Sequence, residues 1–175
     1  MTDEPTLFPV NPELILERID ALDPFRYSNS RNYLAGTVSR LSPYISRGVI
    51  STRMVVERLL KKGYHPAQME KLLQELCWRD YFQRVQQHFP ELHIKSIKHE
   101  QSGNRNGVPL QMMEAGTGIH AIDAGIKELY ATGYMHNHLR MYTAMLACNI
   151  ANCHWQLPAQ WMYYHLLDAD VASNY

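Results

Sequence analysis

A short polar cluster at the start of an apolar helical pattern constrains this fold more than any other feature of the sequence. Residues 135–141 read MHNHLRM and lead directly into the apolar run 141–150. Asn137 and Arg140 stand three residues apart, so they share one face of a helix. An unpaired buried amide costs about 1–3 kcal/mol and an unpaired charge costs more, so both groups need partners. The predicted partners are the polar residues of the segment LLDADVASN, where the helical pattern ends: Asp168, Asp170 and Asn174.

Apolar periodicity in the rest of the chain predicts helices. No stretch alternates between apolar and polar residues for long enough to predict a strand. We therefore expect a single all-α domain over residues 1–175, with an extended arm at 1–10 and a long connection with one helical turn at 91–116. A loop is expected at 23–36, because turn-forming residues dominate there. The predicted helices cover 12–23, 52–60, 66–89, 121–131, 135–153 and 158–167.

Sequence motifs in four segments resemble those of one known family. The long segment TGIHAIDAGIKELYATGYMHNHLRMYTAML, followed by LLDADVASN, resembles the flavin-binding helical domain of the DNA photolyase/cryptochrome family. SRLSPYISRGVIS and ELCWRDYF resemble the same family pattern in the same order. The resemblance implies a multi-helical FAD-binding domain with FAD as its cofactor. The family's α/β antenna-binding domain is not in this sequence, and relatives continue beyond its last residues, so we expect a C-terminally incomplete domain, either a truncated piece or a naturally reduced relative.

Hydroxyl and guanidinium groups gather around residues 37–44, where a helix is predicted to begin. Such groups, together with exposed backbone amides, can hold a diphosphate, although an ordinary helix cap has the same composition. The resemblance assigns the diphosphate of FAD to Ser39, Arg40, Leu41 and Ser42. Val38 stands where the family usually has Thr, so either the loop shifts or one hydroxyl contact is lost. Tyr27 resembles the family's phosphate-contacting tyrosine, and a surface tyrosine is the alternative.

The long helix predicted over 66–89 carries three further candidates. Glu75, Trp78 and Arg79 fall on neighbouring faces of this helix. The resemblance implies that Arg79 contacts the flavin, whereas Glu75 and Trp78 meet a flipped-out pyrimidine dimer. From the residues alone, Trp78 is a core residue, and Glu75 and Arg79 form a surface ion pair.

The C-terminal third supplies the remaining candidates that the resemblance implies. The flavin would be surrounded by Arg79, Asn137, Arg140, Asp168 and Asp170, with Asn174 facing its N5 atom. Met141 ends the motif HNHLRM. A methionine at this position resembles the branch of the family that repairs cyclobutane dimers. Tyr134 departs from the family's usual Trp. Trp155 matches the middle member of the family's three-tryptophan electron relay, and Met112 stands near the position of the outer one.

Charge limits how the chain can meet DNA. Seventeen basic and seventeen acidic residues cancel, so any DNA-binding face must be a local patch. The connection 91–116 carries basic residues that either contact DNA phosphates or form a solvated loop: Lys95, Lys98, His99 and Arg105. Damaged DNA is the partner that the resemblance implies. The alternative function is a cofactor-poor helical module that binds DNA or protein without repair.

The cysteines and the N-terminus indicate a cytoplasmic protein. Cys77, Cys148 and Cys153 are odd in number and two of them lie in apolar helical patterns, which favours buried reduced thiols over a disulfide framework. The N-terminus lacks a basic region followed by an apolar one, and no apolar run approaches the roughly 18 residues of a membrane span, so no membrane partner is expected.

The sequence lacks the motifs of metal sites, of serine hydrolases and of nucleotide-binding glycine-rich loops. His136 and His138 diverge by about 200° on a helix, and there is no HxxxH or CxxC pair, so no metal site is predicted. The serines lack a GxSxG elbow, and no glycine-rich phosphate loop is present. A hydrolase is therefore not predicted.

Overall fold

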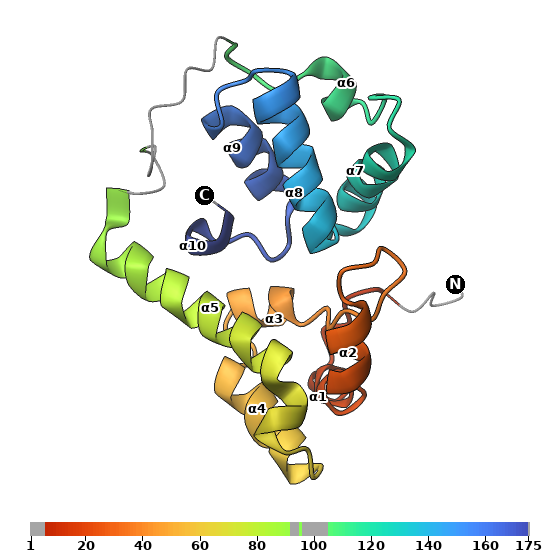
Figure 1. The fold of residues 1–175 in the computed structure, drawn as a ribbon, viewed down its shortest axis with the longest axis vertical. Helices are drawn as coiled ribbons and strands as arrows, with labels where there is room; N and C mark the ends of the chain where they lie inside the picture. The colour runs from red at the N-terminus through yellow and green to blue at the C-terminus, as the bar shows by residue number, and fades with distance from the viewer. Residues whose placement is uncertain (1–5, 92–94, 96–104, 175) are drawn as a thin grey trace. The chain divides into compact units, whose positions relative to one another are not determined.

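The chain is helical throughout the part whose structure is described. The computed structural model describes residues 6–91, 95 and 105–174, and these residues contain helices, turns and one isolated bridge between Arg105 and Cys153, with no strand. The all-α prediction is confirmed. The chain divides into two compact units, residues 1–77 (unit 1) and 78–175 (unit 2), and the boundary falls within helix α5 (Glu70–His88). Figure 1 follows the elements in chain order from red to blue.

Unit 1 is built from short helices with strong sequence caps. In chain order it contains α1 (Pro12–Asp20), α2 (Pro24–Ser30), α3 (Ser42–Ser46), α4 (Thr52–Lys61), the 3-10 helix η1 (Pro66–Met69) and the start of α5. The Asn11 side chain accepts the backbone N–H groups of Glu13 and Leu14, and Ser51 accepts that of Met54, as the cap signals predict. These two helix starts are confirmed.

The predicted loop at 23–36 is wrong over its first half, where α2 forms. The Asp23 side chain accepts hydrogen bonds from the backbone N–H groups of Phe25 and Arg26, and Pro24 occupies the first helical position. This Asp-Pro start repeats the Asn11-Pro12 start of α1. A cap of this kind can begin a helix even where apolar periodicity is weak, because it pairs N–H groups that the first turn leaves open.

Apolar side chains from every helix of unit 1 contribute to its core, and α2 supplies the partly buried Tyr27. The most buried ones lie on α1, on α4 and at the junction of η1 with α5, with Leu41 and Tyr44 at the start of α3. The core members are Ile15, Ile19, Leu22, Leu41, Tyr44, Ile50, Val55, Leu59, Met69 and Leu72. The Tyr44 hydroxyl donates to the Pro9 carbonyl at 2.8 Å, so its polar end is satisfied.

Unit 2 combines helices of 9 to 13 residues with two short helices of four residues. After the second part of α5 it comprises α6 (Leu110–Met113), α7 (His120–Thr132), α8 (Asn137–Met145), the π-helical turn η3 (Leu146–Ile150), α9 (Gln156–His165) and α10 (Val171–Asn174). The helix predicted over 135–153 is shorter at both ends and finishes in the π turn. Gly133 ends α7 in the left-handed conformation at φ 70°, as a C-terminal glycine should.

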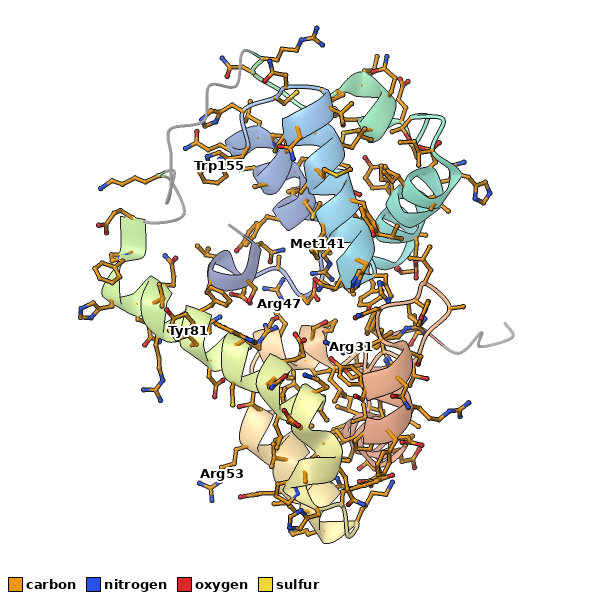
Figure 2. The ribbon with its side chains drawn as sticks, viewed as in Figure 1. Arg31, Arg47, Arg53, Tyr81, Met141 and Trp155 are labelled. Atoms are coloured by element: carbon orange, nitrogen blue, oxygen red, sulfur yellow. The ribbon has the colours of Figure 1, made fainter. Side chains whose placement is uncertain are left out.

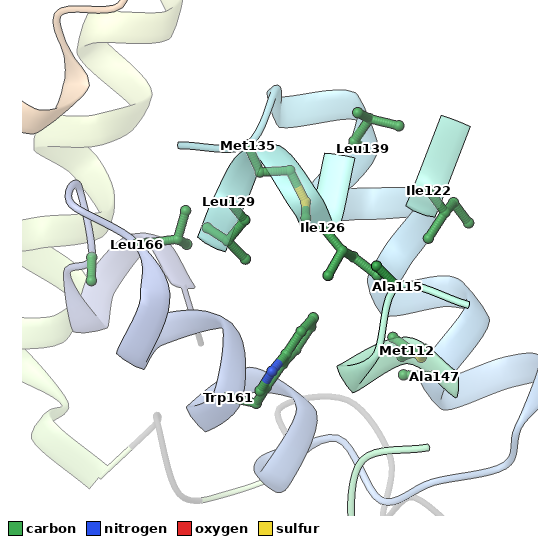
Figure 3. Close-up of a cluster of buried hydrophobic side chains, with 11 residues drawn as sticks. Met112, Ala115, Ile122, Ile126, Leu129, Met135, Leu139, Ala147, Trp161 and Leu166 are labelled. Atoms are coloured by element: carbon green, nitrogen blue, oxygen red, sulfur yellow. The ribbon is translucent and has the colours of Figure 1, made fainter. Parts of the chain in front are cut away.

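Trp161 stands in the core of unit 2. It extends from α9 into a cluster supplied by α6, α7 and α8, as Figure 3 shows. Ile126 and Leu129 of α7 and Met135 are 0–1% exposed in this cluster. The other members are Met112, Ala115, Ile122, Leu139, Ala147, Leu166 and Ala169. The C-terminal helices are therefore held by apolar packing before any polar group is considered.

Three sequence predictions outside the cores have different outcomes. All three cysteines are free, but Cys77 is exposed, so the expectation of buried thiols is wrong for it. Lys95 lies 3.9 Å from Glu91 in an exposed ion pair, and Lys98 and His99 lie outside the described residues. None of the helices described is long and apolar enough to cross a membrane. The single-domain prediction stays a prediction.

Candidate functional site

Arg140 finds the partner predicted for it, whereas the pairing predicted for Asn137 is wrong, because Asn137 is exposed and makes no side-chain hydrogen bond to the described residues. The Arg140 guanidinium donates to the Asp168 carboxylate at 2.8 Å and to the Met135 carbonyl at 2.8 Å, and it lies over the Tyr134 ring. The Asp168 side chain is 4% exposed and that of Arg140 17%. The positive charge of the Arg140 guanidinium and the negative charge of the buried Asp168 carboxylate thus neutralise each other inside unit 2. The predicted pairing of Arg140 with an acid of this segment is confirmed.

Asp170 forms a second centre two residues further along. Its carboxylate accepts from the Arg79 guanidinium at 2.9 Å and from the Gln83 amide at 2.7 Å, one turn apart on α5. The Asp170 backbone N–H donates to the side-chain oxygen of Asn174 at 2.9 Å. Three of the predicted flavin residues therefore lie together: Arg79, Asp170 and Asn174. The sequence missed Gln83, although its position four residues after Arg79 is a detectable signal.

Several polar groups of α8 keep unused hydrogen-bonding capacity. Asn137, at the first position of α8, is exposed and its side chain makes no hydrogen bond to the described residues. The second terminal nitrogen of Arg140 likewise has no partner among them. The His138 Nδ1 atom is buried and has none, which is costly unless something else pairs with it. Asn137 and Arg140 therefore leave hydrogen-bonding groups on one face of α8 for a polar ligand.

The second half of α5 presents aromatic side chains to solvent. Trp78, Tyr81 and Phe82 are 45–55% exposed, and Trp78 stacks on Phe82 with ring centroids 5.8 Å apart. Tyr81 contacts both rings edge-on and is labelled in Figure 2. The alternative that Trp78 is a core residue is therefore wrong. Met141 on α8 is also exposed, at 60% (Figure 2).

The predicted diphosphate segment in unit 1 has an unusual backbone. Arg40 adopts φ 51°, a left-handed conformation that is uncommon for a residue with a side chain. The Ser39 hydroxyl accepts the Leu41 N–H at 3.4 Å, and Ser42 opens α3. The Leu41 side chain is buried in the core, so only its backbone could meet a ligand. A strained arginine next to two hydroxyls is compatible with an anion site.

Tyr27 and Glu75 lie in unit 1 with a shared neighbour. Arg31 lies over the Tyr27 ring at 5.9 Å, and its guanidinium lies 3.4 Å from the Glu75 carboxylate. The Glu75 side chain is 47% exposed. The alternative ion pair between Glu75 and Arg79 is wrong, because each residue pairs with a different partner.

Trp155 lines a cavity inside unit 2. It is half-buried just before α9, where Figure 2 labels it, and Met112, Trp161 and Asn174 line the same cavity. Met112 is 1% exposed, so it does not form an outer, solvent-facing relay position, whereas Met113 beside it is 45% exposed. Among the residues whose placement is described, no group of three His, Cys, Asp or Glu side chains could hold a metal ion.

Comparison with known proteins decides the family. Residues 72–175, more than half of the chain, match the family model described as the FAD binding domain of DNA photolyase. The chain belongs to this family. It is 32% identical over 154 residues to a deoxyribodipyrimidine photo-lyase of Alkalihalophilus pseudofirmus, covering 85% of this chain and 32% of the relative. It is also 32% identical over 171 residues to cryptochrome DASH of Danio rerio, covering 85% of this chain and 29% of the relative.

Solved structures that resemble this chain support the same family assignment. A bacterial class III photolyase from Agrobacterium tumefaciens matches with a TM-score of 0.77 and 26% identity, over 94% of this chain and 36% of that one. An archaeal photolyase from Sulfolobus tokodaii, solved with two FAD molecules, matches with a TM-score of 0.79 and 27% identity, over 96% and 38%. The chain spans about a third of the length of the relatives it matches.

FAD is the cofactor of this domain family, and the residues of unit 2 fit it. The isoalloxazine ring carries carbonyl acceptors and an N–H donor along one edge. The exposed Asn137 amide and the spare nitrogen of Arg140, three residues apart on one face of α8, provide complementary groups. The predicted FAD cofactor is confirmed at the level of the family.

Proposed function

We propose that this chain is the FAD-binding part of a flavoprotein for light-driven repair of cyclobutane pyrimidine dimers in DNA. The family match over residues 72–175 carries the proposal, since it includes α8 and the acidic segment that pairs with it. When bound, FAD supplies the light-absorbing and electron-donating chemistry. The chain's own residues bind and orient it and limit the access of water.

The flavin residues have distinct tasks in this proposal. Asn137 and Arg140 bind the polar edge of the ring, and the pair between Arg140 and Asp168 fixes that guanidinium. Asn174 has its side-chain oxygen held by the Asp170 N–H, which directs its amide nitrogen toward a ligand acceptor such as flavin N5. Asp170 in turn holds Arg79 at the flavin.

Further residues complete the proposal. Ser39, Arg40, Leu41 and Ser42, with Tyr27, bind the diphosphate, and Trp155 is the candidate electron donor. On the DNA side, the exposed Trp78 ring stacks on an unpaired base, with Glu75 and Met141 as further contacts. Because the chain is electrically neutral, we expect weak and salt-sensitive DNA binding. Three free cysteines are compatible with a cytoplasmic protein.

Flavin titration tests the cofactor residues. We expect FAD to bind at least ten times more tightly than FMN, because FMN lacks the second phosphate that the Ser39–Ser42 segment would hold. Ser39→Ala together with Ser42→Ala should weaken FAD binding and leave FMN binding unchanged. Equal affinities for the two flavins would refute the diphosphate assignment, and binding of neither would refute the proposed function.

DNA binding tests the substrate residues. A duplex with one cyclobutane dimer should bind more tightly than the same undamaged duplex, and Trp78→Ala should remove that preference. The control is Tyr164→Ala, which removes an 83% exposed aromatic ring from α9 in the same unit. If both duplexes bind equally and Trp78→Ala changes neither, the chain is better described as a binding module without repair activity.

A further inference from the structure

The dipeptide Asn106-Gly107 joins two fixed points of unit 2. Before it, the backbone N–H and carbonyl of Arg105 form hydrogen bonds of 3.2 and 2.8 Å to residues 152–154, at the isolated bridge. After it, Val108 packs against the core of unit 2. No other asparagine in the sequence is followed by a glycine. The pair is therefore a short connection whose two ends are held while its own groups are not.

The two groups that a reaction between these residues needs are both unengaged. The Asn106 side chain is exposed and makes no hydrogen bond to the described residues, and the backbone N–H of Gly107 makes none either. Gly107 adopts φ 127°, and apart from its chain neighbours no atom lies within 4 Å of the position that a Cβ would take. Neither a hydrogen bond nor a side chain at residue 107 opposes the approach of its nitrogen to the Asn106 amide carbon.

We propose that Asn106 is a site of spontaneous covalent modification, at which its amide becomes a carboxylate. The Gly107 nitrogen bonds to the Cγ carbon of Asn106, its proton passes through solvent to the leaving nitrogen, and the Cγ–N bond breaks to release ammonia. Water then opens the cyclic imide at either carbonyl and gives aspartate or isoaspartate. One water is consumed and one ammonia is released, with no change of oxidation state.

The modification changes both the charge and the length of the main chain at this point. Either product places a negative charge next to Arg105, and isoaspartate adds one methylene group to the main chain between the Arg105 bridge and Val108. Apolar packing holds Val108, whereas two backbone hydrogen bonds hold Arg105. We expect the bridge to yield first, because so short a pairing opens locally at little cost in free energy.

Peptide mass spectrometry of the folded chain, incubated in water labelled with heavy oxygen, tests the site. Asn106 should lose its amide and gain heavy oxygen at least ten times faster than Asn32. Asn32 is the matched control, because it is also exposed and its side chain has no partner among the described residues, but the bulky Tyr33 follows it. Equal rates at the two asparagines, or an unchanged Asn106, would overturn the proposal.

Two comparisons separate the contribution of the fold from that of the dipeptide. Chain unfolded in urea should modify Asn106 at a rate within tenfold of the folded chain, because the fold leaves both reacting groups open. A larger difference would show that the fold protects the site. Asn106→Gln keeps an amide but requires a larger ring, so it should stay unmodified, and modification at the parent's rate would contradict attack by Gly107.

Hydrogen exchange tests the structural consequence in the isoaspartate form, separated from the parent chain by ion exchange. The His154 N–H, which donates to the Arg105 carbonyl, should exchange at least ten times faster than in the parent. The Gly133 N–H, which donates to the Leu129 carbonyl at the end of α7, should be unchanged. Unchanged exchange at His154, or equal acceleration at Gly133, would contradict yielding of the bridge. None of these measurements needs a bound flavin, so they leave the proposed function untouched.

Discussion

The two units handle polarity in opposite ways. Unit 1 keeps its charged pairs at the surface: the Arg58 guanidinium binds Asp20 where both side chains are more than 30% exposed. Unit 2 buries polar groups. The polar side chains that are buried in the described part of the chain are His136, Thr143 and Asp168, and all three belong to unit 2.

The difference extends to packing and backbone geometry. Unit 2 also has the apolar cavity and a π-helical turn. Such turns are rare in proteins, and those that occur often lie at functional sites. In α1 and α4 of unit 1, the side-chain cap and the apolar stripe favour the same helix. Sites that bind ligands often violate such consistency, as the buried polar groups of unit 2 and the strained Arg40 of unit 1 do.

The largest effect is expected from breaking the buried pair. Asp168→Ala leaves the 17% exposed Arg140 guanidinium without its carboxylate, and such a loss costs about 3–5 kcal/mol. Urea unfolding followed by tryptophan fluorescence measures this loss in the free energy of unfolding. The signal reports on unit 2, because Trp78, Trp155 and Trp161 all belong to it.

The matched control removes both charges. Asp168→Leu combined with Arg140→Met should recover most of the lost stability, since apolar replacements of a buried pair are often neutral. A single Asp168→Ala variant that loses less than about 1 kcal/mol would place this pair with the weak surface pairs and erase the contrast between the units.

A smaller effect is expected at matched glycines. Gly133→Ala should cost about 2–4 kcal/mol, because φ 70° strains an alanine and its Cβ would lie 2.5 Å from the Leu167 Cγ atom. Gly63→Ala in unit 1, at φ 91° with open space around it, should cost about 1–2 kcal/mol. Far-UV circular dichroism during urea unfolding measures both. Equal losses would mean that packing at Leu167 adds nothing.

The smallest effect concerns two surface carboxylates. Hydrogen bonds from Arg58 lower the pKa of Asp20, with its charge and that of Lys62 adding to the effect. The Thr117 hydroxyl, and then the backbone N–H groups of Thr117 and Gly118, lower the pKa of Asp123. Both pKa values lie below the unfolded value, so each group stabilises the fold above about pH 4 and loses that effect as pH falls through its folded pKa.

Salt separates the two causes. About 1 M salt screens exposed charges, so it should raise the pKa of Asp20 toward its ordinary value. The pKa of Asp123 should move less, because neutral donors hold its carboxylate, but Thr117→Val should raise it. Carboxyl-carbon NMR titration reads both groups in one sample. A larger salt response at Asp123 would contradict this assignment of causes.

Local signals in the sequence predicted most of the helices. Asn11 and Ser51 each cap a helix within one residue of the predicted start, and Gly133 ends one. The helix α2 was missed because its residues lack an apolar stripe, although Asp23-Pro24 carried a usable cap signal. The motif segments are specific enough to indicate the family by themselves, because four of them occur in the same order along one chain.

Side-chain exposure and pairing were less predictable. Trp78 has the apolar character of a core residue and is nevertheless 55% exposed, because its ring packs against Tyr81 and Phe82 of the same helix and joins neither core cluster. Glu75 stands four residues before Arg79, yet it pairs with Arg31, 44 positions earlier in the chain. Sequence spacing describes neighbours on one helix and cannot weigh partners brought in by other helices.

The sequence by itself determined the helical class, the caps and the family, because these depend on residues close together in the chain or on motifs kept in order. Only the tertiary structure decided which acid pairs with which arginine. From the sequence, Asp168 and Asp170 are equally plausible partners for Arg79 and Arg140, and the fold pairs Arg140 with Asp168 and Arg79 with Asp170. It alone produced the cavity beside Trp155, because a cavity is the space that several separately predicted helices fail to fill when they pack.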